Sequence, residues 1–493
     1  MTIVEVNCGK VKGYTENDIH VFKGIPYAEP PIGNLRFNPP QAKKPWDGVL
    51  DTMEFGPCAF QGYTALEGVT GKLQPESEDC LTLNIWTPAI DNRKRPVMFW
   101  IHGGGYLFGG SRSPAYDGSN LAKRGDVVIV TINYRLGAFG YLFIPGVTAN
   151  AGQLDQVLAL KWVYDNIAKF GGDPNNITIF GESAGAYSVI TLTAMPAAKG
   201  LFRRVIAESM PFIDPKVTKK PTKQLMRALG INIRDIDALR KVAPEEIIKV
   251  QNEITKQGGL AFRPIIDGDT FPIHPLIMMK EGKCKDIDLL MGTNLNEAKL
   301  FTSLDPNLRK INDEKAILFY LGAMGINSEN AQSIINTYRE ARAGDLSNEP
   351  KELLDAIATD LMFRVATLQM LEAQSKYQPN TYNYLFTWET SIYDGMFGSC
   401  HALELPFVFN TFKDPGMKAL VGNATNTESL CESMMDAWLS FARNGNPNHK
   451  GIPQWPTYEK NNRSTLVFGD EIEIANSLFE KERKAWDNIL EIN

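Results

Sequence analysis

One serine in the sequence stands in the pattern of a catalytic nucleophile. Residues 181–185 read Gly-Glu-Ser-Ala-Gly, which places Ser183 in a G-x-S-x-G motif. The apolar run ITIF at 177–180 precedes the motif and AYSVITL at 186–192 follows it, so the serine falls between a predicted strand and a predicted helix. This is the context of a nucleophile elbow, in which a tight turn holds the hydroxyl above a sheet and glycines let neighbouring backbones pass closely. A glycine-flanked turn without function is the alternative, and the flanking strand and helix favour the nucleophile.

A second motif, upstream of the serine, could stabilise the charge that forms when a hydroxyl attacks a carbonyl. The predicted strand VMFWI at 97–101 runs directly into HGGGY at 102–106. Three successive glycines free the backbone to turn its amides toward a ligand, and the helix after Ser183 points its first N–H groups at the same place. We expect the N–H groups of Gly104, Gly105 and Ala184 to form an oxyanion hole. The alternative is an exposed flexible loop, which the apolar residues YLF at 106–108 disfavour.

A serine hydroxyl needs a base to take its proton, and the chain has five histidines. We expect His401 to be the base, because it follows a late predicted strand, where a chain order of nucleophile, acid and base requires it. The other four lie in an N-terminal strand, in the glycine loop, after a proline and in a polar turn: His20, His102, His274 and His449.

The same chain order requires a carboxylate between Ser183 and His401 that orients the imidazole. Glu297 fits best, because the loop TNLNE at 293–297 directly follows a predicted strand. Asp267 and Asp269 are rivals, although their turn precedes that strand instead of following it.

The elements that must position these residues alternate between short apolar runs and helical stretches, which predicts a mostly parallel, twisted α/β sheet covered by helices on both faces. The strands expected with most support are 97–101, 127–133, 177–180, 205–208, 287–292 and 382–386. Between two of them, apolar residues recur every three or four positions and predict a helix with one face on the sheet: Leu154, Val157, Leu160, Tyr164 and Ile167. Two largely helical stretches, 216–257 and 331–374, are expected to be insertions near the substrate.

Composition narrows the class of protein. The 51 basic and 57 acidic residues give a formal charge of −6 without long runs of one sign, so neither a nucleic-acid nor an anionic-membrane surface is expected. No apolar stretch approaches the ~20 residues that span a bilayer, and the N-terminus reads as a strand rather than a signal peptide. Without a linker-like segment or repeat, residues 1–493 are expected to form a single domain with helical insertions, a monomer in the cytoplasm.

Metal and cofactor chemistry are not expected. The six cysteines stand singly, without C-x-x-C spacing, so we expect reduced thiols and no zinc site: Cys8, Cys58, Cys80, Cys284, Cys400 and Cys431. The serine chemistry above needs no cofactor, and its partner is expected to be a small molecule.

Two long segments resemble the signatures of the type-B carboxylesterases, the family that includes the cholinesterases. They are FGGDPNNITIFGESAG at 170–185 and EDCLTLNIWTP at 78–88, and the likeness extends from FKGIPYA at 22–28 to AWLSFA at 437–442. Within this family the chain is most similar to the bacterial para-nitrobenzyl esterases. The resemblance implies an α/β-hydrolase fold and hydrolysis of carboxylic esters, short-chain or aromatic, through an acyl-serine intermediate.

The resemblance also assigns roles to individual residues. It implies a triad of Ser183, Glu297 and His401, with the oxyanion hole at Gly104, Gly105 and Ala184. It further implies two structural ion pairs, and supporting roles beside the triad for Glu182 and Ser209. The implied pairs are Arg36 with Glu78 and Arg135 with Asp173.

The chain departs from the family pattern at several places. Cys58 and Cys80 match positions that are bridged in secreted relatives, and no tryptophan lies between them, so the aromatic platform for quaternary ammonium is missing and choline specificity is not expected. Met210 and Pro211 replace small residues. Cys400, directly before the base, is expected to be either an inert buried thiol or a reactive group beside the site.

Other functions remain open at this point. A non-catalytic binding protein on the same scaffold would lack a working triad, whereas this chain has a candidate for every part. An amidase, thioesterase or lipase would use the same triad, because acyl transfer does not by itself select the leaving group. Four residues hint at an apolar pocket for short or aromatic groups: Tyr106, Phe108, Phe301 and Met210.

Overall fold

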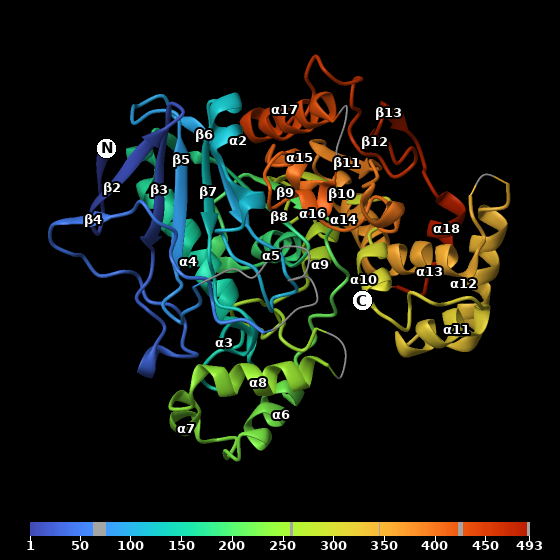
Figure 1. Cartoon of the computed structure of the whole chain (residues 1–493), viewed down its shortest axis with the longest axis horizontal. Helices are drawn as coiled ribbons and strands as arrows, with labels where there is room; N and C mark the ends of the chain where they lie inside the picture. Colours follow the sequence, from blue (N-terminus) through green and yellow to red (C-terminus); the bar gives the residue numbers. More distant parts are fainter. Residues whose placement is uncertain (63–74, 257–259, 345, 423–426, 491–493) are drawn as a thin grey trace.

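A large sheet runs through the chain, and the computed structural model describes it within residues 1–62, 75–256, 260–344, 346–422 and 427–490 (Figure 1). Its strands are β1 (Thr2–Val6), β2 (Gly9–Glu16), β3 (Ile19–Pro26), β4 (Val49–Asp51), β5 (Thr82–Thr87), β6 (Arg95–Ile101), β7 (Val128–Ile132), β8 (Gly172–Glu182), β9 (Arg204–Glu208), β10 (Asp288–Asn294), β11 (Thr381–Phe386), β12 (Thr465–Phe468) and β13 (Ile472–Ala475). Across the sheet their order is β1-β2-β3-β5-β7-β6-β8-β9-β10-β11-β12-β13, with β4 paired to β2.

The centre of the sheet is parallel and its margins are antiparallel. Strands β7, β6, β8, β9, β10, β11 and β12 run parallel to one another. At one margin β1, β2, β3 and β5 pair antiparallel, with β5 antiparallel to β7, and at the other margin β13 pairs antiparallel with β12. Parallel strands are buried on both faces, and every residue of β6, β7 and β9 is buried. This explains why these strands could be recognised as continuous apolar runs.

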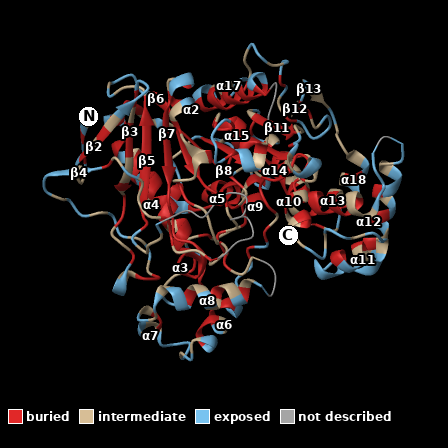
Figure 2. Cartoon of the chain, in the orientation of Figure 1, coloured by how far each residue is buried: buried red, intermediate tan, exposed pale blue. Residues whose placement is uncertain are grey.

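Helices cover both faces. They are α2 (Ser119–Gly125), α3 (Gly137–Tyr141), α4 (Ala151–Asn166), α5 (Ala184–Leu192), α6 (Lys220–Ala228), α7 (Ile236–Arg240), α8 (Pro244–Thr255), α9 (Pro275–Lys280), α10 (Lys299–Leu304), α11 (Glu314–Ala323), α12 (Ser328–Ala341), α13 (Pro350–Thr359), the π-helical turn η5 (Asp360–Arg364), α14 (Val365–Ser375), α15 (Leu405–Val408), α16 (Lys418–Val421), α17 (Glu428–Asn444) and α18 (Glu480–Lys484). Helices α4, α5 and α14 share one apolar cluster with the sheet, and α2, α15 and α17 share the other, so the buried core lies on the two faces of the strands (Figure 2).

Two helical groups extend from this core, as the sequence predicted. Helices α6 to α8 lie between β9 and β10 in the chain, and α11 to α13 lie between β10 and β11. In Figure 1 the first group projects at the bottom and α11 to α13 at the right. Residue 257, the predicted end of the first stretch, lies outside the described residues.

The turns that matter for chemistry follow strands of the parallel region. The segments after β6, β8, β10 and β11 all leave its carboxyl edge, and the strand order reverses direction around β6, where ligands of open α/β sheets bind. The predicted α/β class with helices on both faces is therefore confirmed. Each predicted strand lies inside an observed strand or extends beyond its end by one residue at most.

One predicted ion pair is correct and one is wrong. Arg36 pairs with Glu78, with Nη2 2.5 Å from Oε2. Arg135 pairs with Asp155, with Nη2 2.7 Å from Oδ1, and not with Asp173. Asp155 is fully buried on α4, whereas Asp173 Oδ1 accepts a local hydrogen bond from Asn175 N. The buried guanidinium of Arg135 is therefore paired with a carboxylate that is buried beside it.

The predicted stripe on α4 is also only partly right. Leu160 and Ile167 are buried, but Leu154 and Tyr164 are half-buried, and the polar residues Gln153, Asp155 and Gln156 are buried instead.

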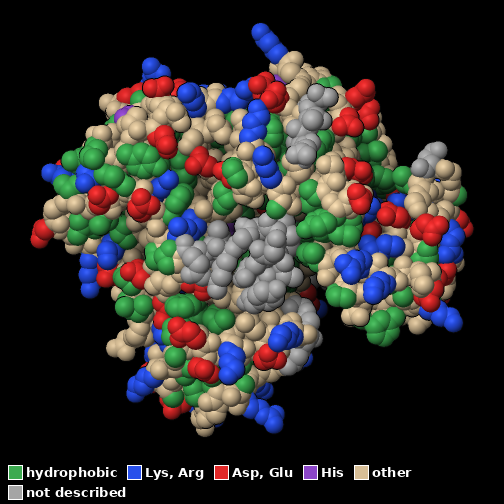
Figure 3. All heavy atoms as spheres, in the orientation of Figure 1, with side chains coloured by type: hydrophobic (Ala, Val, Ile, Leu, Met, Phe, Trp, Pro, Cys, Tyr) green, Lys and Arg blue, Asp and Glu red, His purple; other side chains and the backbone are tan. Residues whose placement is uncertain are grey.

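No helix within the described residues is long and apolar enough to cross a membrane. On the face shown in Figure 3, cationic and anionic side chains are interspersed.

Candidate active site

Ser183 occupies a strained turn between β8 and α5. Its backbone lies at φ 55° and ψ −121°, a conformation that costs a non-glycine residue about 1–3 kcal/mol. Two backbone hydrogen bonds hold the turn: Ser183 N donates to Glu208 O at 2.9 Å, and Tyr187 N donates to Ser183 O at 2.9 Å. The serine is half-buried between buried neighbours, so the turn presents its side chain out of the core.

The glycines around the serine are required by close packing. A Cβ on Gly185 would lie 2.0 Å from Ile101 O, and one on Gly181 would lie 2.6 Å from the carbonyl carbon of Gly185. A Cβ on Gly103 would lie 3.2 Å from Cβ of Ser183. The glycine loop after β6 therefore passes directly against the serine turn, as the two sequence motifs predicted.

The amides of the glycine loop and of Ala184 lie next to the Ser183 turn. Gly104 and Gly105 have φ values of 108° and 59°, which turn their peptide groups out of the strand direction. Within the part of the chain that the structure describes, no hydrogen bond occupies the amides of Gly104, Gly105 or Ala184. Ala184 is the first residue of the nine-residue helix α5, whose positive dipole end adds to the attraction for an anion.

His401 lies between two carboxylates and is 5% exposed. Its Nδ1 is 2.6 Å from Glu297 Oε2, and its Nε2 is 2.9 Å from Oε1 of Glu182. Burial alone lowers the pKa of an imidazole, but the charges of Glu182 and Glu297 outweigh burial and raise the pKa of His401 well above its usual range. Rings of Phe301 and Phe363 lie 5.2 and 4.7 Å from the imidazole, between ring centroids.

The loops that carry Glu297 and His401 are bonded to each other. Asn296 N donates to Ser399 O at 2.9 Å, and Ser399 N donates back to the Asn296 side chain at 3.1 Å. Asn294 N donates to Glu297 Oε1 at 2.7 Å, and Asn294 Nδ2 donates to Cys400 O at 2.7 Å. These contacts fix the acid and the imidazole relative to each other before any ligand binds.

Two further buried carboxyl groups, those of Glu404 and Glu208, interact electrostatically with the carboxylates of the site. Asn294 Nδ2 donates to Glu404 at 2.5 Å, and Trp438 Nε1 donates to Glu208 at 3.0 Å. Burial, followed by the charges of Glu182 and Glu297, raises the pKa of Glu404 to about 8. Burial, followed by the charge of Glu404, raises the pKa of Glu208 well above its usual range. Glu404, with its pKa at about 8, therefore keeps its proton at neutral pH.

The thiol beside the imidazole is buried. Cys400 has no exposed surface, and burial raises the pKa of its thiol far above the usual range. Of the two states expected for it, the structure supports the inert thiol. Cys58 and Cys80 both carry free thiols, and burial raises the pKa of Cys58 to about 11.

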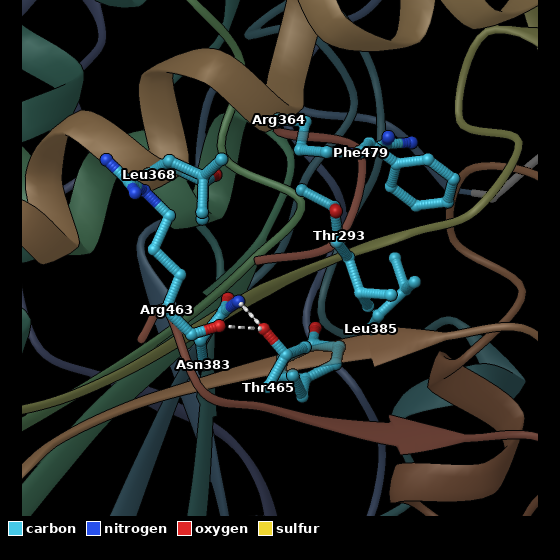
Figure 4. Close-up of a pocket in the computed structure, with 11 residues that line it drawn as sticks. Thr293, Arg364, Leu368, Asn383, Leu385, Arg463, Thr465 and Phe479 are labelled. Atoms are coloured by element: carbon cyan, nitrogen blue, oxygen red, sulfur yellow. Dashed lines mark hydrogen bonds between the residues drawn. The ribbon is translucent and has the colours of Figure 1, made fainter. Parts of the chain in front are cut away.

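A small cavity lies behind the acid loop, between η5, α14 and the ends of β10 to β12 (Figure 4). Its volume is about 20 Å³, enough for about one water molecule and too small for an ester. At its edge the guanidinium of Arg364 stacks over Phe479 at 4.5 Å and donates to Leu295 O at 3.2 Å, which joins the π-helical turn to the acid loop. In the lining of this cavity, Asn383 Nδ2 donates a hydrogen bond to Thr465 Oγ1 at 2.7 Å.

Comparison with known proteins agrees with this geometry. The sequence profile of the carboxylesterase family matches residues 1–486. The chain belongs to the carboxylesterase family. The para-nitrobenzyl esterase of Bacillus subtilis is 37% identical to it, with 98% of each chain covered, and the phenmedipham hydrolase of Pseudarthrobacter oxydans is 36% identical, with 97% of each covered. A crystal structure of a carboxylesterase from Geobacillus stearothermophilus superimposes with a TM-score of 0.88 at 37% identity, covering 99% of this chain and 100% of that one.

Membership in the carboxylesterase family makes this chain a carboxylic ester hydrolase, as the resemblance implied. The structure brings Glu297 and His401 together, and it places Ser183 beside the glycine loop and Glu182 against His401. Ser209, which the resemblance placed near the triad, follows Glu208 in a similar turn at φ 54°.

Some predictions of pocket residues were less accurate. Phe301 contacts the imidazole, but Tyr106 is fully buried, with its hydroxyl near Ser188 at 3.3 Å and its ring against Tyr141. Asn294, Asn296, Glu208 and Glu404 were missed as parts of the site. The only local signal for the two asparagines was their position in the loop after β10, and none marked the two glutamates.

Proposed function

We propose that this carboxylesterase cleaves esters with Ser183 as nucleophile, His401 as base and Glu297 as the acid that orients it. The observation that carries the proposal is the 2.6 Å contact between His401 Nδ1 and Glu297 Oε2, on loops bonded to each other and packed beside the strained serine turn. Serine is a weak nucleophile until a neighbouring imidazole takes its proton.

In the proposed reaction His401 Nε2 takes the hydroxyl proton while Ser183 Oγ attacks the ester carbonyl. The amides of Gly104, Gly105 and Ala184 then stabilise the oxyanion, and each well-placed donor of this kind is worth about 3–4 kcal/mol. The imidazolium returns the proton to the departing alcohol, and a water molecule, deprotonated by the same imidazole, releases the acid from the acyl-serine. The free amides and the positive end of α5 support this role for the glycine loop.

The preferred substrates that we propose are short-chain or aromatic esters of the para-nitrobenzyl and para-nitrophenyl kind. The support is the 37% identity to a para-nitrobenzyl esterase and the two phenylalanine rings against the imidazole. We also propose that residues 1–493 form one domain, since one sheet extends from β1 to β13. A cytoplasmic location is proposed because all six cysteines carry free thiols, which persist in reducing compartments.

A covalent serine inhibitor tests the nucleophile directly. An organophosphorus probe should label Ser183 in the intact enzyme, as mapped by mass spectrometry, and should fail to label Ser183→Ala. Hydrolysis of para-nitrophenyl esters of graded chain length should fall about 10⁶-fold in kcat in the same variant. Ser188→Ala, one turn along the same helix, is the matched control and should keep both the label and the activity. A Ser183→Ala protein that is labelled and active would overturn the proposal.

A further inference from the structure

A second cavity, with a volume of about 570 Å³, has Leu260 beside the glycine loop in its lining. Its lining includes Phe212–Asp214 after β9, residues of α6 and α8, Leu260, Ala261 and Arg263 before α9, Met324 after α11, and Met362 in the turn η5. Its volume falls in the usual range for a small-molecule pocket. It is therefore large enough for part of an ester substrate.

This cavity borders the elements of the catalytic site. Leu260 Cδ2 lies 3.6 Å from the position of a Cβ on Gly105, so one wall faces the glycine loop. Phe212 N donates to Met362 O at 2.6 Å, and Phe363, the next residue, lies against the ring of His401. A substrate whose carbonyl oxygen sits at Gly105 can extend from there into the cavity.

Arg263 lies half-buried in this wall without an ion pair among the described residues, and the charge of Asp214 acts on it from beyond ion-pair distance. Its Nε donates to Asp214 O at 2.8 Å and its Nη1 donates to Leu260 O at 2.9 Å. Within the described residues, no carboxylate oxygen lies within ion-pair distance of its guanidinium. By contrast, the buried Arg135 and Arg204 each have one, Asp155 at 2.7 Å and Asp288 at 3.1 Å.

A cation removed from water is costly unless an anion is near it. Two backbone carbonyls fix the orientation of the Arg263 fork but leave Nη2 without a described partner. The one carboxylate of the described lining, Asp214, contacts Lys216 at 3.5 Å, and Lys220 adds a second cation at the rim. The cavity thus combines apolar walls with a positively charged end.

We propose that Arg263 binds a carboxylate on the substrate, so that this enzyme prefers esters with an apolar body and a distal anionic group, such as monoesters of dicarboxylic acids. This inference rests on the proposed function, and it assigns the substrate class of that site. A guanidinium fork with free N–H groups matches the geometry of a carboxylate. The apolar walls bind the methylene or aryl segment between the ester and the anion.

Matched pairs of esters test the proposal. One pair places the charge on the acyl side, mono-para-nitrophenyl adipate against para-nitrophenyl hexanoate. The other places it on the alcohol side, 4-carboxybenzyl butyrate against 4-methylbenzyl butyrate. The readout is the ratio of kcat/KM for the anionic ester to kcat/KM for its neutral partner. In Arg263→Gln this ratio should fall about 10- to 100-fold for at least one pair, the loss expected for a hydrogen bond to a charged group.

Two further variants keep the test decisive. Lys220→Gln removes an exposed cation from the rim of the same cavity and should change the ratio less than about threefold. Arg263→Lys keeps the charge without the fork, and its ratio should lie between those of the wild type and Arg263→Gln. If Arg263→Gln does not fold, the ratio of Arg263→Lys is compared with that of the wild type instead.

The outcomes separate this inference from the proposed function. Full activity on neutral esters in Arg263→Gln, with unchanged ratios for both pairs, would overturn the role of Arg263 and leave the triad intact. An equal loss of ratio in Lys220→Gln would also overturn it, because the effect would then belong to the general field. Wild-type enzyme without activity on any neutral ester would instead contradict the proposed function.

Discussion

His401 Nε2 lies 2.9 Å from Glu182 Oε1, while Nδ1 lies 2.6 Å from Glu297 Oε2. An imidazole held between two carboxylates is stabilised in its protonated form. The proposed base must be neutral to take a proton from Ser183, and its Nε2 must exchange Glu182 for the hydroxyl. Together with Glu297, Glu182 therefore raises the pH at which the base becomes available.

Replacing Glu182 by glutamine should shift the acid limb of the pH–rate profile to lower pH. The raised pKa of His401 means that the wild-type rate increases with pH to values above the ordinary imidazole pKa of about 6.5. Removing one of the two charges should lower that limb by about 1 unit or more. The measurement is kcat/KM for a neutral para-nitrophenyl ester between pH 5 and pH 9.

An exposed glutamate provides the control for this shift. Glu245→Gln, in the first turn of α8, should leave the acid limb where it is in the wild type. If Glu182→Gln and Glu245→Gln give superimposable profiles, the charge of Glu182 does not act on the base.

Replacing Glu297 by glutamine should reduce kcat about 10³- to 10⁴-fold. The amide is close in size, but it no longer stabilises the imidazolium, and it can hold the ring in the wrong tautomer. The contact at Nδ1 and the bond from Asn294 N both end on this one carboxylate. Steady-state kinetics on a simple aryl ester measure the loss, and a decrease smaller than tenfold would remove Glu297 from the triad.

The two candidate partners of Arg135 can be separated by stability. Asp155→Asn breaks a buried pair and should reduce the free energy of unfolding by about 3–5 kcal/mol. Asp173→Asn alters a local turn and should cost less than about 1 kcal/mol. Denaturant unfolding of both variants measures the difference, and a larger loss for Asp173→Asn would restore the pairing that the sequence resemblance implied.

The parts of this structure that could be predicted are those encoded locally. The serine turn has its strand, its glycines and its helix within sixteen consecutive residues, so its chemistry and its place in the fold were both readable. The parallel strands were readable because burial on both faces makes them apolar throughout.

The parts that could not be predicted depend on contacts between distant segments. Asp155 lies on a helix whose buried face includes polar residues, because Arg135, from the segment between β7 and α3, enters the interior beside it. Glu208 and Glu404 have no local pattern of their own, and only the folded chain brings Glu208 to Trp438 and Glu404 to Asn294. The place of Arg263 in a cavity likewise depends on several segments that are distant in sequence.

Glu404 should make the stability of the enzyme depend on pH in the alkaline direction. Its pKa is raised to about 8 in the folded protein, so between pH ~4.3 and 8 the folded state keeps a proton that the unfolded state releases. The stability that this proton supplies is fully present below the unfolded pKa and is lost as the pH rises through the folded pKa.

Glu404→Gln keeps the shape of the protonated acid and cannot ionise. The Tm of Glu404→Gln minus the Tm of the wild type should therefore increase from pH 5 to pH 9. The change corresponds to a few kcal/mol in the free energy of unfolding. Thermal unfolding at both pH values measures it, with Glu245→Gln as the exposed control, and parallel curves for Glu404→Gln and the wild type would mean that this carboxyl group is already ionised in the folded protein.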